Sequence, residues 1–384
     1  MRLRSLDVLR GIAALLVVLW HWQHLWVLGR DDLIFKNETV VDRTTEPFYP
    51  ALKLAYEYGF SAVNMFFVIS GFIFFHLYHD RIVTRSIRSV EFGLLRFSRL
   101  YPLHLATLLA VAGLQLVFHN QAGQYFVYPR NDWPHFTAAL FFIQGTNKES
   151  AFNGPAWSLT IEIAMYATFF VLARLGGLKH WLGAALVVLV GLPLFWLNDS
   201  IADSIGQGLV GFFGGGLASR FVRAVSGSRQ ARGFLVLLAV MTVAGWAIVV
   251  YLVYNPDMAT KVVSILPVAR NMAPRLAVTC LLFPLTVVTL ALHETLYRPS
   301  YAGLHWLGDI SYSSYLLHFP LQLGIAILVY AQLLSIASVQ SPWALIAFFA
   351  VLIPISAWAY ALVEAPAQKG LRRLFFGAKR RAPG

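Results

Sequence analysis

About ten apolar stretches recur along this chain, each long enough to cross a lipid bilayer as a helix, which takes about 20 apolar residues. The chain is 58% hydrophobic and only 12% charged, whereas soluble domains carry about 25% charged residues. The sequence therefore predicts an all-α polytopic membrane protein, a bundle of about ten transmembrane helices in one integral-membrane domain over residues 1–384. The approximate spans are 6–28, 58–79, 100–118, 157–175, 181–197, 202–218, 234–254, 273–293, 309–330 and 342–362.

Two further features of the composition exclude other classes of protein. The net charge is +12, but in a membrane protein an excess of Lys and Arg is typical of loops that face the anionic cytoplasmic leaflet. We therefore expect the lipid bilayer, and no nucleic acid, as a partner. The single cysteine, Cys280, excludes a disulfide within the chain and a cysteine metal cluster.

The positions of Lys and Arg predict the orientation of the chain. With the N-terminus inside, the inner segments carry most of the basic residues, so both termini are predicted to be cytoplasmic. Residues 363–384 then form a basic cytoplasmic tail, and Glu364-Ala365-Pro366 is predicted to end the last helix. The stretch 136–146 is too short to cross and is predicted to be re-entrant or interfacial. The long outer segment 29–57 is either a cover over a site or a spacer.

The first span contains ionisable side chains, which are costly in lipid and by default mark a functional site. Arg10 and His21 lie close to three helical turns apart, so they share one face at a separation of about 16 Å. Asp7 and His24 lie three residues before Arg10 and three after His21, and extend the same stripe. This pattern predicts proton chemistry at His21. No carboxylate lies beside the two histidines, so we expect no metal.

Arg96 and Arg99 lie one turn apart where the third span begins. Arginine forks bind phosphate oxygens in a bidentate manner, so this pair would suit the diphosphate of a nucleotide-like donor. The alternative is that both are ordinary arginines of a cytoplasmic helix end.

Two more polar clusters lie inside apolar helices. Glu162 has Ser158 one turn before it and Tyr166 one turn after it, and a carboxylate there must be paired or protonated. We expect it to orient His21, to hydrogen-bond a hydroxyl, or to form a structural ion pair with an arginine. In the run Ser311–His318, the serines are predicted to pack helices together, and His318 is a candidate second polar residue of the site.

Together these pieces resemble the acyltransferase 3 family of polytopic membrane acyltransferases. The resemblance runs from the first span to the last, in family order, and has ten residues between Arg10 and His21. Each piece is weak alone, and the combination is specific. The matching pieces are Leu6–Ala14, Phe66–Phe72, Arg96–Pro102, Trp157–Glu162, Ser311–His318 and Glu364–Pro366.

The resemblance implies an acyl-CoA donor on the cytoplasmic side, with acetyl as the commonest acyl group, and no bound cofactor. The acceptor it implies is a hydroxyl of a carbohydrate, such as a surface polysaccharide or a lipid-linked glycan, and the location is the bacterial inner membrane. Activity in the family is associated with the positions of His21, Arg10, Arg96 and Arg99. His21 would act as a general base or carry the acyl group transiently, and Glu162 would orient the imidazole or the acceptor. The alternatives are a transporter or flippase of a glycan or lipid, and acylation of a small secondary metabolite.

Overall fold

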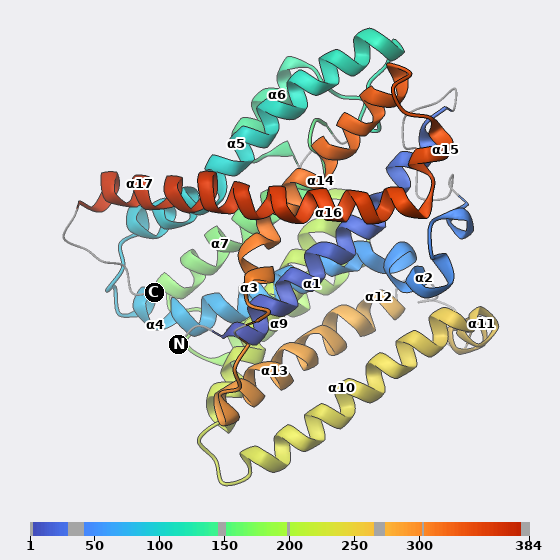
Figure 1. Ribbon diagram of the computed structural model, residues 1–384. Helices are drawn as coiled ribbons and strands as arrows, with labels where there is room; N and C mark the ends of the chain where they lie inside the picture. The colour runs from blue at the N-terminus through green and yellow to red at the C-terminus, as the bar shows by residue number, and fades with distance from the viewer. Residues whose placement is uncertain are drawn as a thin grey trace. The chain divides into compact units, whose positions relative to one another are not determined.

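A computed structural model describes residues 3–29, 42–144, 151–197, 200–264, 273–301 and 303–377. The regular elements of these residues are helices (Figure 1), which confirms the predicted all-α class. The chain divides into two compact units. Unit 1 comprises Met1–Ala13, Phe60–Arg88 and Ile161–Gly308, and unit 2 comprises Ala14–Gly59, Ser89–Thr160 and Asp309–Gly384.

Eight helical stretches of the described residues are long and apolar enough to cross a membrane, and each overlaps a predicted span, although Tyr49–Leu77 begins inside the predicted outer segment 29–57. The polytopic class is therefore confirmed. The stretches are Arg4–Val27, Tyr49–Leu77, Ser89–Ala122, Gly154–Arg174, Ala231–Tyr254, Pro274–Tyr297, Trp306–Tyr330 and Pro342–Phe376.

The two remaining predicted spans, 181–197 and 202–218, also form helices but differ from the other eight. Helix α8 (Trp181–Trp196) is apolar but only 16 residues long. Helix α9 (Ser200–Val225) has 26 residues and is not among the apolar helices. Every side chain from Ile201 to Arg220 is at least partly buried. The glycines of α9 allow neighbouring helices to approach it closely.

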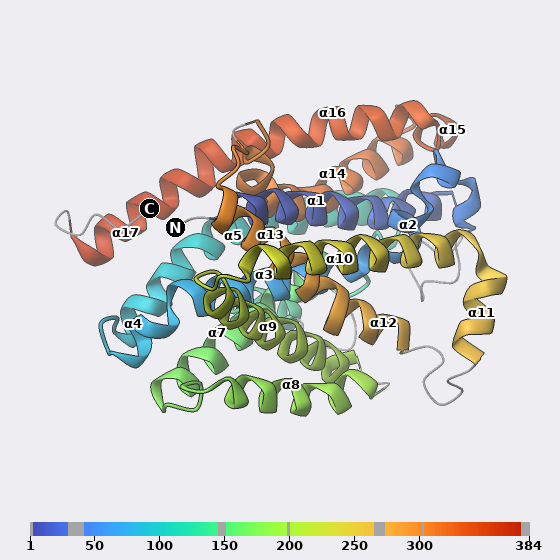
Figure 2. The same cartoon turned by 90° about the horizontal axis from the view of Figure 1, so that it is seen from below.

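Those glycines position α9 between α3 (Ala62–Leu77) and α8 in unit 1. A Cβ atom on Gly71 would overlap the carbonyl of Phe212, and one on Gly215 would overlap the carbonyl of Val68. Small residues allow helix backbones to approach this closely in membranes. Figure 2 shows α8 and α9 side by side at one edge of unit 1.

Unit 1 also contains three short helices and the packed pair α10 (Ala231–Tyr254) and α13 (Phe283–Tyr297). Helix α4 (His79–Val83) follows α3, and α11 (Pro256–Ser264) follows α10. Helix α10 (Ala231–Tyr254) packs on α13 (Phe283–Tyr297), and Trp246 Nε1 donates to Thr286 Oγ1 at 3.0 Å. A short helix, α12 (Ala273–Ala277), and a π-helical turn, η7 (Val278–Leu282), lead into α13.

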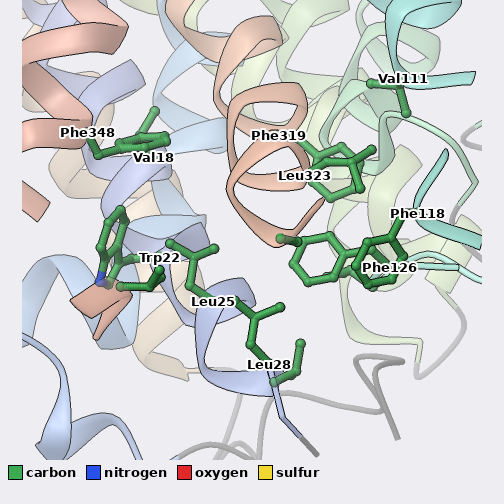
Figure 3. Close-up of a cluster of buried hydrophobic side chains, with 14 of the residues drawn as sticks. Val18, Trp22, Leu25, Leu28, Val111, Phe118, Phe126, Phe319, Leu323 and Phe348 are labelled. Atoms are coloured by element: carbon green, nitrogen blue, oxygen red, sulfur yellow. The ribbon is translucent and has the colours of Figure 1, made fainter. Parts of the chain in front are cut away.

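Unit 2 is built around two long helices, α5 (Ser89–Ala122) and α14 (Trp306–Tyr330). Helix α14 belongs to unit 2 from Asp309 onward. Its apolar core combines side chains of these two helices with side chains of α1 (Arg4–Trp20) and α16 (Pro342–Ala359), as Figure 3 shows. Trp22 and Phe319 are fully buried there, and Trp22 lies 5.2 Å from the ring of Phe348, centroid to centroid. The shorter elements are η2 (Arg43–Thr45), α2 (Tyr49–Tyr58), α6 (Trp133–Leu140), η5 (Gly154–Ala156) and α15 (Ile336–Val339).

The last span continues into the tail, contrary to the predicted helix end at Glu364-Ala365-Pro366. Helix α16 (Pro342–Ala359) passes through a π-helical turn, η8 (Tyr360–Glu364), into α17 (Ala365–Phe376), which forms one nearly continuous ribbon in Figure 1. Pro366 lies in the first turn of α17, where its missing N–H costs little. The π-turn therefore allows the chain to remain helical across the proline.

Candidate active site

The first predicted span changes its helical form at His21. Helix α1 (Arg4–Trp20) is α-helical, and His21–Val27 form a 3₁₀ helix, η1, instead of the single α-helix predicted over 6–28. Residues three apart eclipse one another in a 3₁₀ helix. His21 and His24 therefore lie on the same side, with ring centroids 5.0 Å apart.

The hydrogen bonds of His21 define its tautomer. Its Nδ1 lies 2.9 Å from the backbone carbonyl of Val17. A carbonyl only accepts, so Nδ1 carries the proton in the neutral ring and Nε2 carries the lone pair. His21 is therefore arranged to accept a proton at Nε2, as a general base requires.

Gln322 of α14 connects the two histidines, and the sequence analysis missed it. Its Nε2 donates to the carbonyl of His21 at 3.0 Å, and its Oε1 lies 3.0 Å from Nδ1 of His24. Because the amide oxygen can only accept, Nδ1 of His24 is the donor. A glutamine inside an apolar helix, one turn after His318, was the signal that could have revealed it.

His318 completes a cluster of three imidazoles in unit 2. Its ring centroid lies 4.8 Å from that of His21, with the planes tilted by 39°. The side chain is fully buried, and the backbone carbonyls of Ser314 and Tyr315, one turn earlier in α14, are the hydrogen-bond acceptors beside its ring. The structure therefore brings together His21, His24 and His318 from the predicted set.

Ser158 is linked to this cluster through Tyr315, whose ring centroid lies 6.0 Å from that of His318. Tyr315 donates its hydroxyl proton to the carbonyl of Pro155 at 2.5 Å. Ser158 Oγ lies 2.8 Å from the Tyr315 hydroxyl, so Ser158 is the donor of that bond. Residues of the segments 154–158 and 311–318, which are far apart in the sequence, are therefore hydrogen-bonded to one another in unit 2.

Asn153 holds the same segment against α14, and it was also missed. Its Nδ2 donates to the carbonyl of Leu316 at 3.0 Å. Pro320 lies four residues after Leu316 and has no N–H, so this carbonyl has no partner within the helix. The side chain of Asn153 replaces the missing donor.

Unit 1 contains the other end of the first span. Arg10 lies 3.5 Å from Asp7, and its Nη2 donates to the carbonyl of Gly308 at 2.6 Å. The predicted neighbours Asp7 and Arg10 are therefore an ion pair. Glu294 accepts from the backbone N–H groups of Arg4 and Ser5, at 2.8 and 2.7 Å, and this carboxylate stabilises the start of α1.

Glu162 lies on helix α7 (Trp157–Arg174), in the part assigned to unit 1. Its Oε1 accepts from Ser70 at 3.1 Å and from the hydroxyl of Tyr166. Tyr166 is thus a partner of Glu162, as the spacing predicts. That Glu162 orients His21 stays a prediction.

Arg96 and Arg99 lie one turn apart on α5 and are both partly buried. Between them, Ser98 is fully buried and bonds back to the carbonyl of Leu95 at 3.1 Å. The rings of Phe97 and Tyr101 stack 4.4 Å apart. The role of the two arginines in donor binding stays a prediction.

The described end of the outer segment 29–57 contacts the residue before His21, while residues 30–41 lie outside the described part. Arg43 donates to the carbonyl of Trp20 at 2.8 Å and pairs with Glu46 at 2.9 Å. Burial raises the pKa of Glu46 to about 7, although the Arg43 guanidinium opposes the shift. This segment therefore supports the end of α1 and is more than a spacer.

No group of three or more His, Cys, Asp or Glu side chains in the described ranges is placed to hold a metal ion. The ring of His21 contacts those of His24 and His318. Their arrangement suits proton transfer and hydrogen bonding.

Comparison with known proteins agrees with the motifs. A family model described as an acyltransferase domain matches residues 3–361. Acyltransferase MdmB of Streptomyces mycarofaciens is 33% identical over 121 residues, which are 30% of this chain and 29% of that protein. Exopolysaccharide production protein ExoZ of Rhizobium meliloti (strain 1021) is 35% identical over 130 residues, or 32% and 37% of the two chains. The chain thus spans about a third of the length of these relatives. No solved structure matches it.

The family model covers nearly the whole chain, including the segments that contain His21, Arg96, Glu162 and His318. The resemblance inferred from the motifs is therefore confirmed, together with the enzyme class that it implies. The chain belongs to the acyltransferase 3 family of membrane acyltransferases.

Proposed function

We propose that this chain is a membrane O-acyltransferase that moves an acyl group, acetyl in the first instance, from cytoplasmic acyl-CoA to a carbohydrate hydroxyl. Membership of the family supports acyl transfer. The similarity to an exopolysaccharide production protein supports a glycan acceptor, such as a surface polysaccharide or a lipid-linked glycan. The enzyme would work as one domain in a bacterial inner membrane, with both termini in the cytoplasm.

The observation that carries this proposal is the tautomer of His21. The hydrogen bond from Nδ1 to the carbonyl of Val17 leaves Nε2 as the basic atom of a buried, neutral ring. Such a base removes the proton of the acceptor hydroxyl as its oxygen attacks the thioester carbon. A positioned general base contributes about 10²–10⁴-fold to the rate.

The donor is held by arginines in this proposal. Arg96 and Arg99 would bind its phosphates with their planar forks, and Arg10 would contribute to the same task. Glu162, hydrogen-bonded to Ser70 and Tyr166, would act as an orienting carboxylate.

The test is release of free CoA thiol from acetyl-CoA by the purified protein, with candidate glycans as acceptors. We expect His21→Ala to lower turnover at least 100-fold, and the paired Arg96/Arg99 alanine variant to raise the KM for acetyl-CoA. The matched control is His104→Ala, because His104 is also buried in unit 2 but bonds to the carbonyl of Ala139. We expect this control to keep its turnover.

Wild-type turnover in His21→Ala would refute the assignment of the base. If the wild type released no thiol with any acceptor, proteoliposomes loaded with glycan would test the rival activity. Movement of the glycan without consumption of acyl-CoA would identify a transporter.

A further inference from the structure

The change of helical form in the first span falls at the residue that carries the proposed base. Helix α1 ends at Trp20, and the 3₁₀ helix η1 begins at His21 and continues for seven residues. A 3₁₀ helix has poorer hydrogen-bond geometry than an α-helix, and runs longer than three or four residues are uncommon. A 3₁₀ stretch of this length therefore needs support from groups outside it.

Side-chain nitrogens lie at the backbone carbonyls on both sides of this change. The carbonyl of Val17 meets Nδ1 of His21 at 2.9 Å. The carbonyl of Trp20 accepts from Arg43 at 2.8 Å, and the carbonyl of His21 accepts from Nε2 of Gln322 at 3.0 Å. Of these donors, Gln322 is the one that ties the junction to helix α14.

Gln322 uses both ends of its amide on η1. Besides donating to the carbonyl of His21, it accepts from Nδ1 of His24 at 3.0 Å. Residues three apart eclipse one another in a 3₁₀ helix, so one amide reaches the backbone of the first and the ring of the second. In an α-helix, three residues turn by only about 300°, and the two groups would no longer be aligned. The bridge therefore favours the 3₁₀ form at His21.

Burial indicates how Gln322 acts. Gln322 is 0% exposed, whereas His21 is 7% exposed. Its neighbours in α14, Phe319 and Leu323, are fully buried as well, so the amide is held on a rigid, packed element. The amide thus lies behind His21 and acts through it.

We propose that Gln322 is a positioning residue for acyl transfer. It holds the backbone of His21 so that the ring keeps its bond to Val17 and Nε2 stays directed at the acceptor hydroxyl. The inference rests on the proposed function. A catalytic group must be held within about 0.5 Å of its productive position, and a displacement of about 1 Å costs about 100-fold in rate. Loss of the amide should therefore slow the chemical step without weakening donor binding.

The experiment compares two substitutions of Gln322 with a matched control. Gln322→Met removes both hydrogen bonds with little change in side-chain length, and Gln322→Asn keeps a buried amide that is one methylene group too short. The control is Gln115→Met. Gln115 is also a fully buried amide of unit 2, and it bonds to the backbone of Phe126 through Nε2 at 2.9 Å and Oε1 at 3.0 Å.

The first readout is the rate of CoA thiol release by the purified full-length proteins, with acetyl-CoA and a glycan acceptor, beside their thermal unfolding. We expect kcat to fall about 100-fold in Gln322→Met and Gln322→Asn, with a KM for acetyl-CoA within a few-fold of wild type. Gln115→Met should lose comparable thermal stability and keep its kcat. This split separates positioning of the base from a general loss of stability.

The second readout is the ¹⁵N NMR spectrum of the proteins labelled with ¹⁵N-histidine, which needs no turnover. The signals of His21 are identified by their loss in His21→Ala. We expect a protonated Nδ1 and an unprotonated Nε2 in the wild type and in Gln115→Met. In Gln322→Met and Gln322→Asn, His21 should show a mixture of the two tautomers.

A wild-type kcat in Gln322→Met and Gln322→Asn, or an equal loss of kcat in Gln115→Met, would overturn the proposal. Unchanged signals of His21 in both variants of Gln322 would overturn it as well. If Gln322→Met did not fold, Gln322→Asn alone would decide. A wild type that releases no thiol would instead refute the proposed function, while altered signals of His21 in the same variants would still show that Gln322 positions this ring.

Discussion

Three imidazoles from two distant parts of the sequence meet in unit 2, and one buried amide bonds to two of these residues. Gln322 bonds to the backbone of His21 and to the ring of His24, which fixes the proton of His24 on Nδ1. The histidines are predictable from the sequence because ionisable groups are costly in lipid. Gln322 is not, because an uncharged amide is less conspicuous, although the same cost applies to it.

Glu46 makes stability depend on pH. Its pKa is raised from 4.5 to about 7 by burial, against the opposing effect of Arg43. The folded protein therefore holds this proton more tightly than the unfolded chain does. The contribution of this group to stability is greatest below about pH 4.5 and falls as the pH rises towards 7, by at most about 1.4 kcal/mol per pH unit. Thermal unfolding in detergent across this range should show the decline.

Glu46→Gln is the control for this prediction, because its side chain does not titrate. The difference in unfolding temperature between wild type and Glu46→Gln should change steadily between pH 4.5 and 7, in the direction of a relatively weaker wild type at the higher pH. A difference that stays constant across the range would show that Glu46 is not the group responsible.

At the scale of the element, helix α14 combines an interior proline with a side-chain cap. Pro320 leaves the carbonyl of Leu316 without its helical partner, and Asn153 supplies a donor at 3.0 Å. This arrangement also holds the segment that precedes α7 beside Tyr315, which bonds to Pro155. The proline is therefore part of how the two motifs meet.

A double-mutant cycle tests this coupling. Asn153→Ala should destabilise the wild type by roughly 1–3 kcal/mol, because it leaves a buried carbonyl unpaired. In the background of Pro320→Ala, the new N–H at position 320 can bond to Leu316, so the same change should cost clearly less. Thermal unfolding of the four proteins gives the coupling energy. Additive effects would show that the proline and the asparagine act independently.

At the scale of the whole molecule, the eight long apolar helices establish a polytopic membrane protein. The excess of basic residues on the predicted inner segments favours cytoplasmic termini. A search for long apolar helices does not include α9, which packs against α3 and α8 and is at least partly buried from Ile201 to Arg220.

Cysteine labelling tests the predicted orientation. The chain has one cysteine, so Cys280→Ala gives a cysteine-free background. In that background we expect Gln121→Cys, at the exposed end of α5, to react with a membrane-impermeant maleimide on intact spheroplasts. Gly370→Cys on α17 should react only after the membrane is permeabilised. The reverse pattern would place the termini outside.

The sequence by itself determined the class, the positions of the spans and the family, because hydropathy is a sum over neighbouring residues and the motifs are local strings. It also identified Asp7 with Arg10 and Glu162 with Tyr166, since both pairs follow from helical spacing. Only the tertiary structure decided that Ser158 pairs with Tyr315, that Asn153 caps Leu316 and that Gln322 joins His21 to His24. These contacts join residues more than 150 positions apart, and helical periodicity specifies the face of a helix but not which other helix packs against it.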